Sequence, residues 1–213
     1  MKKAVRIAAL AAASLATLGT GCAPLVVAGA VGGALVVSDR RSVGIQLEDE
    51  AIERRVNRAL AERFERGSIN ISVNSYDRKV LLTGETLNEQ QRAEAEKLAA
   101  AADNVRAVVN EIEVGILSTV GSRSNDTAVS AKVRGMLLNE RNLSSAAFKV
   151  VTERANVYLM GRVTEHEGEL AGVIASRTVG VQKVTKLFDY ITEQQAAELA
   201  PPAAPAASPQ QRP

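Results

Sequence analysis

Hydrophobic and polar positions follow one pattern in the first half of the chain. Residues 50–64 carry apolar side chains every three or four positions, which predicts an amphipathic helix. Ile69, Ile71 and Val73 then alternate with polar residues, as in a half-buried strand. A second strand ending at Gly84, a helix over 88–102 and a strand over 105–114 complete the predicted order of helix, strand, strand, helix, strand.

The same pattern returns 77 residues later. Lys79-Val-Leu-Leu-Thr-Gly84 has a near copy in Asn156-Val-Tyr-Leu-Met-Gly161, and the upstream helix and strand align at the same offset. Two copies of one small domain explain this period better than an array of short repeats. The second copy is therefore predicted to contain a helix from Asp126 to Arg141 capped by Asn125 or Asp126, strands over 148–152 and 157–161, a helix over 165–178 and a strand over 181–191.

These elements predict an α+β fold of two tandem domains. In each domain, two helices would pack on one face of a three-stranded mixed sheet. The end of the chain is rich in Ala and Pro, which favours disorder. The expected organisation is a signal peptide at 1–21, an acylated N-terminus and apolar linker at 22–44, a first domain at 45–116, a second domain at 124–192 and a disordered tail at 193–213.

The N-terminus has the layout of a secretory signal. Lys2, Lys3 and Arg6 precede an uncharged run that ends in small residues directly before Cys22, the single cysteine of the chain. This junction is similar to a bacterial lipobox, in which the cysteine is cleaved free and acylated, although Gly19 stands where the usual box has Leu. We therefore predict Cys22 as the lipidation site, carrying palmitate or a related acyl chain.

An uncleaved membrane anchor is the alternative for this region. The uncharged stretch from Ile7 to Ser38 would be about 48 Å long as a helix, well beyond a hydrocarbon core of roughly 30 Å. Pro24 and several glycines would also interrupt such a helix. Residues 23–37 alone are short for spanning. Two consecutive segments, a signal and an apolar spacer, fit the sequence better.

Composition excludes several classes of function. Aromatic residues make up 3% of the chain and Trp is absent, so surfaces for stacking bases are few and nucleic acid is not an expected partner. The formal charge of +2 depends on the leader, because without its three cations 23 Lys and Arg face 24 Asp and Glu. With one Cys and one His, neither a metal site nor a catalytic constellation is expected. His166 is interpreted as a surface residue at a helix start. No cofactor and no small-molecule substrate are predicted.

The order of elements, the duplication and the motifs resemble a known family. A strand ending Val-x-Leu-x-Gly, at Val80 to Gly84 and Val157 to Gly161, and a later Gly-Val-x-x-Val at Gly180 to Val184 resemble the BON domain. Together with the lipobox, the introduction Asp39-Arg-Arg-Ser-Val-Gly44 resembles that of the dual-BON outer-membrane lipoproteins of the DolP type. Ala23 after the cysteine is, by the same resemblance, consistent with the outer membrane.

This resemblance implies a non-enzymatic, lipid-anchored protein that faces the periplasm and supports envelope integrity. The first helix of the second domain would bind anionic phospholipid. Ala128 stands where similar proteins can carry a bulky aromatic, so an interfacial anchor is missing. The candidate phospholipid-binding residues are Thr127, Ala128, Lys132, Arg134, Gly135, Met136, Leu138 and Arg141.

Other interpretations of these residues stay open. Lys132 and Arg134 could be the solvated flank of an amphipathic helix, whereas Val129, Val133 and Leu137 recur at core spacing. Arg40 and Arg41 could pair with headgroups beside the anchor. The alternative function is an adapter or regulator that binds envelope proteins, such as the outer-membrane β-barrel assembly machinery, through sheet edges or helix faces.

Overall fold

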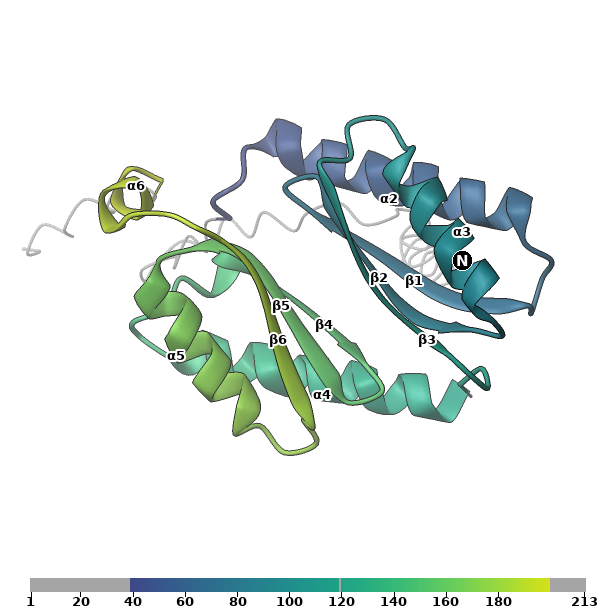
Figure 1. Ribbon diagram of the computed structural model, residues 1–213. Helices are drawn as coiled ribbons and strands as arrows, with labels where there is room; N and C mark the ends of the chain where they lie inside the picture. Colours follow the sequence, from purple (N-terminus) through teal and green to yellow (C-terminus); the bar gives the residue numbers. More distant parts are fainter. Residues whose placement is uncertain (1–38, 119, 200–213) are drawn as a thin grey trace, which may run out of the picture. The chain divides into compact units, whose positions relative to one another are not determined.

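The computed structural model describes residues 39–118 and 120–199, and the side chains of 120–123 are left aside (Figure 1). Within this part of the chain, the predicted order of elements is found twice, and the α+β prediction is confirmed. The first copy contains α2 (Val43–Arg63), β1 (Ile69–Tyr76), β2 (Lys79–Thr86), α3 (Glu89–Ala100) and β3 (Ala107–Val114). The second contains α4 (Val120–Asn139), a short 3-10 turn (Ser145–Ala147), β4 (Phe148–Glu153), β5 (Asn156–Val163), α5 (Glu165–Ser176) and β6 (Lys183–Tyr190), and α6 (Glu193–Glu198) follows it.

Each copy builds one mixed sheet, as predicted. In the described residues, the strand order is β1-β2-β3 in one sheet and β4-β5-β6 in the other. The first two strands of each copy pair antiparallel, and the third pairs parallel to the second. Helices α2 and α3 lie on one sheet and α4 and α5 on the other (Figure 1). The parallel pairing follows from the connection, because a helix between two strands lets the chain re-enter the sheet in the same direction.

One core lies between the helices and the sheet of each copy. In the first, Ile52 and Val56 of α2 meet Val80 and Leu82 of β2. The second core is equivalent and is filled mainly from α4, α5, β4 and β5 by Val129, Val133, Leu137, Val150, Val157, Leu159, Val163, Ala171 and Ala175. Aliphatic residues and alanine thus dominate both cores, although Phe188 of β6 is also buried in the second, with Phe148 packed against it.

The opposite faces of the two sheets are also covered. Leu81 lies between Val80 and Leu82 in sequence, so it points to the other side of β2. There Leu81 and Tyr76 pack with Tyr158 and Met160 of β5 in a third apolar cluster. We call this contact between the two copies the seam.

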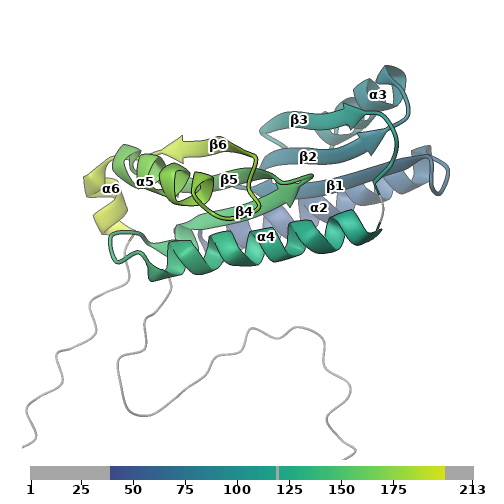
Figure 2. The same ribbon diagram turned by 90° about the horizontal axis from the view of Figure 1, so that it is seen from below.

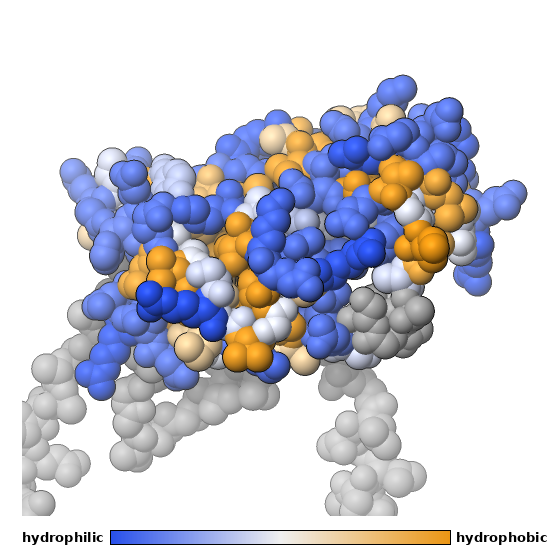
Figure 3. All heavy atoms as spheres, turned by 60° about the horizontal axis from the view of Figure 1, so that its bottom comes forward, coloured by the Kyte–Doolittle hydropathy of each residue, from blue (hydrophilic) through white to orange (hydrophobic). Residues whose placement is uncertain are grey.

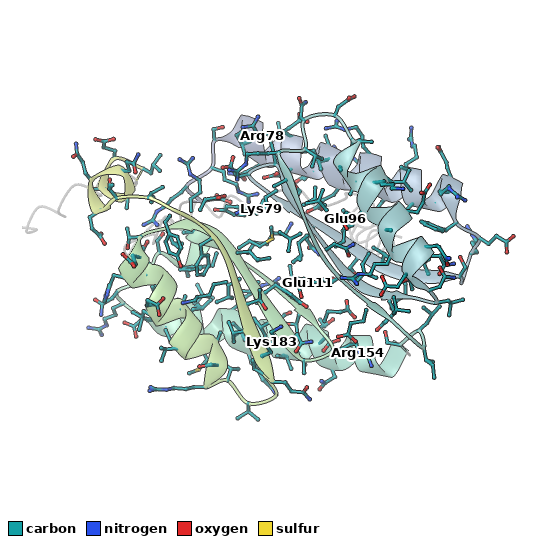
Figure 4. The ribbon with its side chains drawn as sticks, viewed as in Figure 1. Arg78, Lys79, Glu96, Glu111, Arg154 and Lys183 are labelled. Atoms are coloured by element: carbon teal, nitrogen blue, oxygen red, sulfur yellow. The ribbon has the colours of Figure 1, made fainter. Side chains whose placement is uncertain are left out.

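Charged groups border the seam. Lys79 Nζ donates to a carboxylate oxygen of Asp189 at 2.9 Å, and Tyr158 Oη lies 3.4 Å from a carboxylate oxygen of Glu111. Figure 4 labels the side chains of Lys79 and Glu111. Burial opposes ionisation of Asp189, but hydrogen bonds from Lys79 and Arg106 lower its pKa below the ordinary value. Asp189 is therefore a charged member of the seam at neutral pH.

The glycine of each Val-x-Leu-x-Gly motif is required because a neighbouring backbone carbonyl approaches it closely. Gly84 has φ of +106°, and a Cβ built on it would lie 1.9 Å from the carbonyl oxygen of Asn70. At Gly161 the same construction comes within 2.4 Å of the carbonyl oxygen of Ala147, the residue equivalent to Asn70. The prediction that Gly84 ends the strand is wrong, since β2 continues to Thr86.

Several predicted boundaries need correction. Helix α2 begins at Val43 rather than near residue 50, so residues 43 and 44 of the predicted linker are helical. Helix α4 begins at Val120, so Asp126 lies inside it, and it ends at Asn139 before Arg141. Residues 193–198 of the predicted disordered tail form α6, capped by Thr192. The signal peptide, Cys22, the spacer at 23–37 and residues 200–213 lie outside the described residues.

Candidate functional site

Helix α4 has one buried side, which attaches it to the second domain. Val129, Val133 and Leu137 are almost fully buried at intervals of four residues, which confirms that they belong to the core. Asp126 lies on the same side and accepts the backbone N–H groups of Arg154 and Ala155, both at 2.9 Å. Helix α4 is thus fixed to β4 and to the β4–β5 turn (Figure 2).

The rest of α4 offers a mixed surface to solvent. Thr127, Ala128 and Lys132 are exposed, and Met136 and Leu138 are 49% and 60% exposed. In the view that brings the lower side of Figure 1 forward, apolar patches are interspersed with hydrophilic side chains (Figure 3). A cation beside exposed aliphatic side chains is the composition expected of a helix that lies at a lipid interface.

Arg134 does not share this surface in the way the sequence suggested. One guanidinium nitrogen donates to the carbonyl oxygen of Val150 on β4 at 2.8 Å. The residue also lines a cavity of about 260 Å³ beside Ser130 and Thr152, whose hydroxyls are 2.8 Å apart. Arg134 is exposed but is tied to the sheet by this hydrogen bond, whereas Lys132 is exposed and makes no side-chain hydrogen bond to another element within the described residues. Of the two, Lys132 is the basic side chain that points freely outward from the described part of α4.

The remaining two candidates have different surroundings. Arg141 is exposed, but it lies in the turn beyond the end of α4. Gly135 lies within the helix, and a Cβ added to it would meet nothing within 4 Å. Close approach of another part of the fold therefore does not explain this glycine.

Replacing Gly135 with alanine should raise the free energy of unfolding by about 0.5–1 kcal/mol. The added methyl group meets open space, and alanine loses less backbone entropy than glycine on entering a helix. Urea unfolding followed by circular dichroism measures this change. A destabilised variant would show that a neighbour needs the space beside Gly135.

Long side chains cover several backbone groups at the sheet edges. At Ser75 on β1, the N–H donates to Glu53 at 2.7 Å, and the carbonyl oxygen accepts from Lys149 at 3.0 Å. On β4 and β6, Arg134 and Lys79 donate to carbonyl oxygens. Side chains placed in this way discourage the addition of a further strand. The helix faces are therefore the better candidates for a docking surface.

Two arginines expected near headgroups are instead paired within the fold, Arg40 buried and Arg41 largely covered. The Arg40 guanidinium binds both carboxylate oxygens of Glu167, at 2.6 and 2.8 Å. The Arg41 guanidinium binds Asp49 at 2.7 Å and lies 4.0 Å from the ring centre of Tyr76. The proposal that Arg40 and Arg41 pair with lipid headgroups is therefore wrong.

Asp49 and Glu167, the partners of these arginines, were not among the candidate residues singled out from the sequence. Burial opposes ionisation of Glu167, but hydrogen bonds from Arg40 and the Thr164 N–H lower its pKa below the ordinary value. Burial raises the pKa of Tyr76 to about 12. The sequence could have pointed to Asp49 through Asp126, its equivalent 77 residues later.

Neither a metal centre nor a membrane-crossing helix is found in the described part of the chain. Across 39–118 and 120–199, no group of three or more His, Cys, Asp or Glu side chains could hold a metal ion. Within the same residues, no helix combines the length and the apolar character needed to cross a bilayer. His166 is exposed in the first turn of α5, as predicted.

Known proteins share this arrangement. The BON domain family model matches residues 48–116 and 125–192. The outer membrane lipoprotein DolP of Haemophilus influenzae is 30% identical over 80% of this chain and 89% of its own length. The 21 kDa hemolysin of Actinobacillus pleuropneumoniae is 32% identical over 72% of this chain and 79% of its own.

Two further proteins are more loosely similar. The osmotically-inducible protein Y of Escherichia coli is 30% identical over 71% of this chain and 77% of its own. A solved structure of CdsD, a structural protein of the type III secretion system of Chlamydia trachomatis, matches 68% of this chain and 95% of its own at 11% identity, with a TM-score of 0.29. The two domain matches and the relatedness to DolP together show that this chain belongs to the BON domain family, as a two-domain member of the DolP type.

Proposed function

We propose that this protein is a lipoprotein of the outer membrane that faces the periplasm and binds anionic phospholipid through the outward side of α4. Its acylated Cys22 would supply the anchor, and its role would be to support envelope integrity by binding rather than by catalysis. The relatedness to an outer membrane lipoprotein supports the location. The main support for this binding surface is that Lys132, Met136 and Leu138 are exposed on a helix whose other side is packed into the second domain.

The strength of this contact can be bounded. A basic residue near an anionic membrane contributes about 1 kcal/mol. On α4, Lys132 is the main source of this charge, and Arg134, exposed but hydrogen-bonded to β4, would add to it less directly. An isolated α4 contact would therefore be weak. When an acyl anchor already holds the protein at the membrane, binding of α4 becomes an intramolecular step with a high effective concentration. Even a weak contact can then determine how the protein lies on the membrane.

Reversing the charge of Lys132 should weaken binding to anionic vesicles. Lys132→Glu replaces an attraction of about 1 kcal/mol with a comparable repulsion, so we expect roughly a 10- to 30-fold loss of affinity. Cosedimentation with phosphatidylglycerol vesicles, compared with phosphatidylcholine vesicles, measures it. Arg54→Glu on α2, where Arg54 is largely exposed, is the matched control and should leave the second-domain contact intact. Equal losses of affinity in both variants would show that the change in net charge, and not the position of Lys132 on α4, weakens binding.

An aromatic residue at position 128 should strengthen the same contact. Ala128 is exposed on α4, so Ala128→Trp places an indole at the surface without disturbing the core. Tryptophan favours the headgroup region of a bilayer, and its burial there should improve affinity for vesicles roughly tenfold. Its fluorescence should shift to the blue on binding. An unshifted spectrum with anionic vesicles would show that α4 faces away from the membrane.

The alternative role as an adapter for envelope proteins has one observation in its favour. Leu87, Val114 and Ile116 are exposed where β2 and β3 end together, with Thr86 paired to Val114. Neighbouring apolar side chains of this kind can mark a protein contact. Vesicle binding that is unaffected by Lys132→Glu, together with binding to assembly-machinery proteins that is lost on Ile116→Asp, would favour the adapter.

A further inference from the structure

The segment before α2 contacts both domains. Ser42 is the N-cap of α2, and the three residues before it are Asp39, Arg40 and Arg41. Although these residues precede the first domain, Arg40 binds the second domain and Arg41 binds the first. We call residues 39–42 the strap. It is the first described part of the chain after the region that contains Cys22.

The contact of Arg40 with the second domain is built into that domain's fold. The Arg40 side chain is 8% exposed, and besides Glu167 it donates to the carbonyl oxygen of Arg162 at 2.9 Å. Glu167 in turn accepts from the Thr164 N–H at 2.9 Å and completes the capping box of α5. A paired, buried guanidinium of this kind is costly to remove, because its partner carboxylate stays buried without compensation.

The contact of Arg41 is equally integrated into the first domain. Its partner Asp49 is 2% exposed and also accepts the N–H groups of Asp77 and Arg78 in the β1–β2 turn, at 2.8 and 2.7 Å. The guanidinium lies over the ring of Tyr76. Arg41 therefore stabilises both the carboxylate that organises the turn and the aromatic side chain that ends β1.

Tyr76 continues this chain of contacts across the seam. Its hydroxyl donates to the carbonyl oxygen of Ala147 at 3.2 Å and accepts from the N–H of Arg162 at 3.3 Å. The carbonyl oxygen of the same Arg162 accepts from Arg40. The strap and the seam thus meet at one residue of β5.

The duplication provides an internal comparison. Asp126 is the equivalent of Asp49 and binds its own turn in the same way, but no ion pair to it is formed among the described side chains. The capping position of α3 that corresponds to Glu167 is Gln91, a neutral and half-buried residue. Of these matched positions, the two whose side chains bind an arginine are Asp49 and Glu167, and in both cases the arginine belongs to the strap.

From these contacts we infer that the strap is a clasp, in which residues 39–42 join the two domains and support the seam. Displacing the strap would leave Asp49 and Glu167 buried without their cations and loosen the seam.

Hydrogen exchange of the full-length protein in detergent micelles tests the clasp. Arg40→Met keeps the length of the side chain and removes its charge. We expect exchange at least roughly tenfold faster in peptides covering 74–82 and 158–168, on both sides of the seam, with α3 unchanged. Arg54→Met, at an exposed ion pair of α2, is the matched control and should leave both peptides as in the parent protein.

Two outcomes would overturn the inference. Faster exchange confined to residues 39–45 would show that the strap closes over the seam without supporting it. An equal increase in α3, which the strap does not contact, would show a general loss of stability rather than a clasp. If Arg40→Met does not fold, Arg40→Lys keeps one charge and is judged by the same peptides, with a smaller increase expected.

Discussion

Replacing Asp49 with alanine is expected to lower the free energy of unfolding by about 3–5 kcal/mol. The carboxylate is buried and accepts from the Ser75 hydroxyl at 2.7 Å, from two backbone N–H groups of the β1–β2 turn and from Arg41. Asp77 and Arg78 in that turn have positive φ, so the turn depends on outside support. Without Asp49, the buried donors lose their acceptor. Of the two acids that bind the Arg41 guanidinium, Asp39 then remains. Urea unfolding measures the loss.

The duplication supplies the control for this prediction. Asp126→Ala removes the acceptor for two backbone N–H groups but leaves no arginine behind among the described side chains. Its expected cost is about 1–3 kcal/mol, the range for leaving buried donors unsatisfied. If both variants lost the same stability, the Arg41 contact would add nothing, and a loss below about 1 kcal/mol for Asp49→Ala would contradict its role in the turn.

Replacing Gly84 with alanine should cost about 3 kcal/mol or more. A non-glycine residue at φ of +106° is strained, and the new methyl group would lie 1.9 Å from the carbonyl oxygen of Asn70, so β1 and β2 must move apart. The same urea experiment measures the change. Gly135→Ala is the matched control, since it makes the same chemical change where there is open space. Equal effects at both positions would show that β1 and β2 separate without cost.

Local periodicity was sufficient to predict the fold, because each element buries one side. The alternation at Ile69, Ile71 and Val73 and the four-residue spacing of Val129, Val133 and Leu137 each define a core-facing surface. The start of α4 was misplaced for a physical reason. Asp126 looked like an N-cap, but its carboxylate binds a turn 28 residues away, so the helix can begin earlier at Val120.

The candidate site was less predictable than the fold. The exposure of Met136 and Leu138 follows from the position of the core residues, whereas the direction of Arg134 depends on a carbonyl oxygen of β4. The seam and the strap arise from contacts between two domains, and periodicity within one domain carries no information about them. Arg40 and Glu167 are 127 residues apart, and their pairing has no local signature.

A chemical-shift titration of isotopically labelled protein from Asp39 to Leu199 tests the central claim most directly. The protein is titrated with bicelles that contain phosphatidylcholine alone or phosphatidylcholine with phosphatidylglycerol. We predict shifts at the outward residues Ala128, Lys132, Met136 and Leu138, and only when the anionic lipid is present. Unchanged α4 signals with both lipids would contradict phospholipid binding by the second domain and leave Cys22 as the proposed membrane contact.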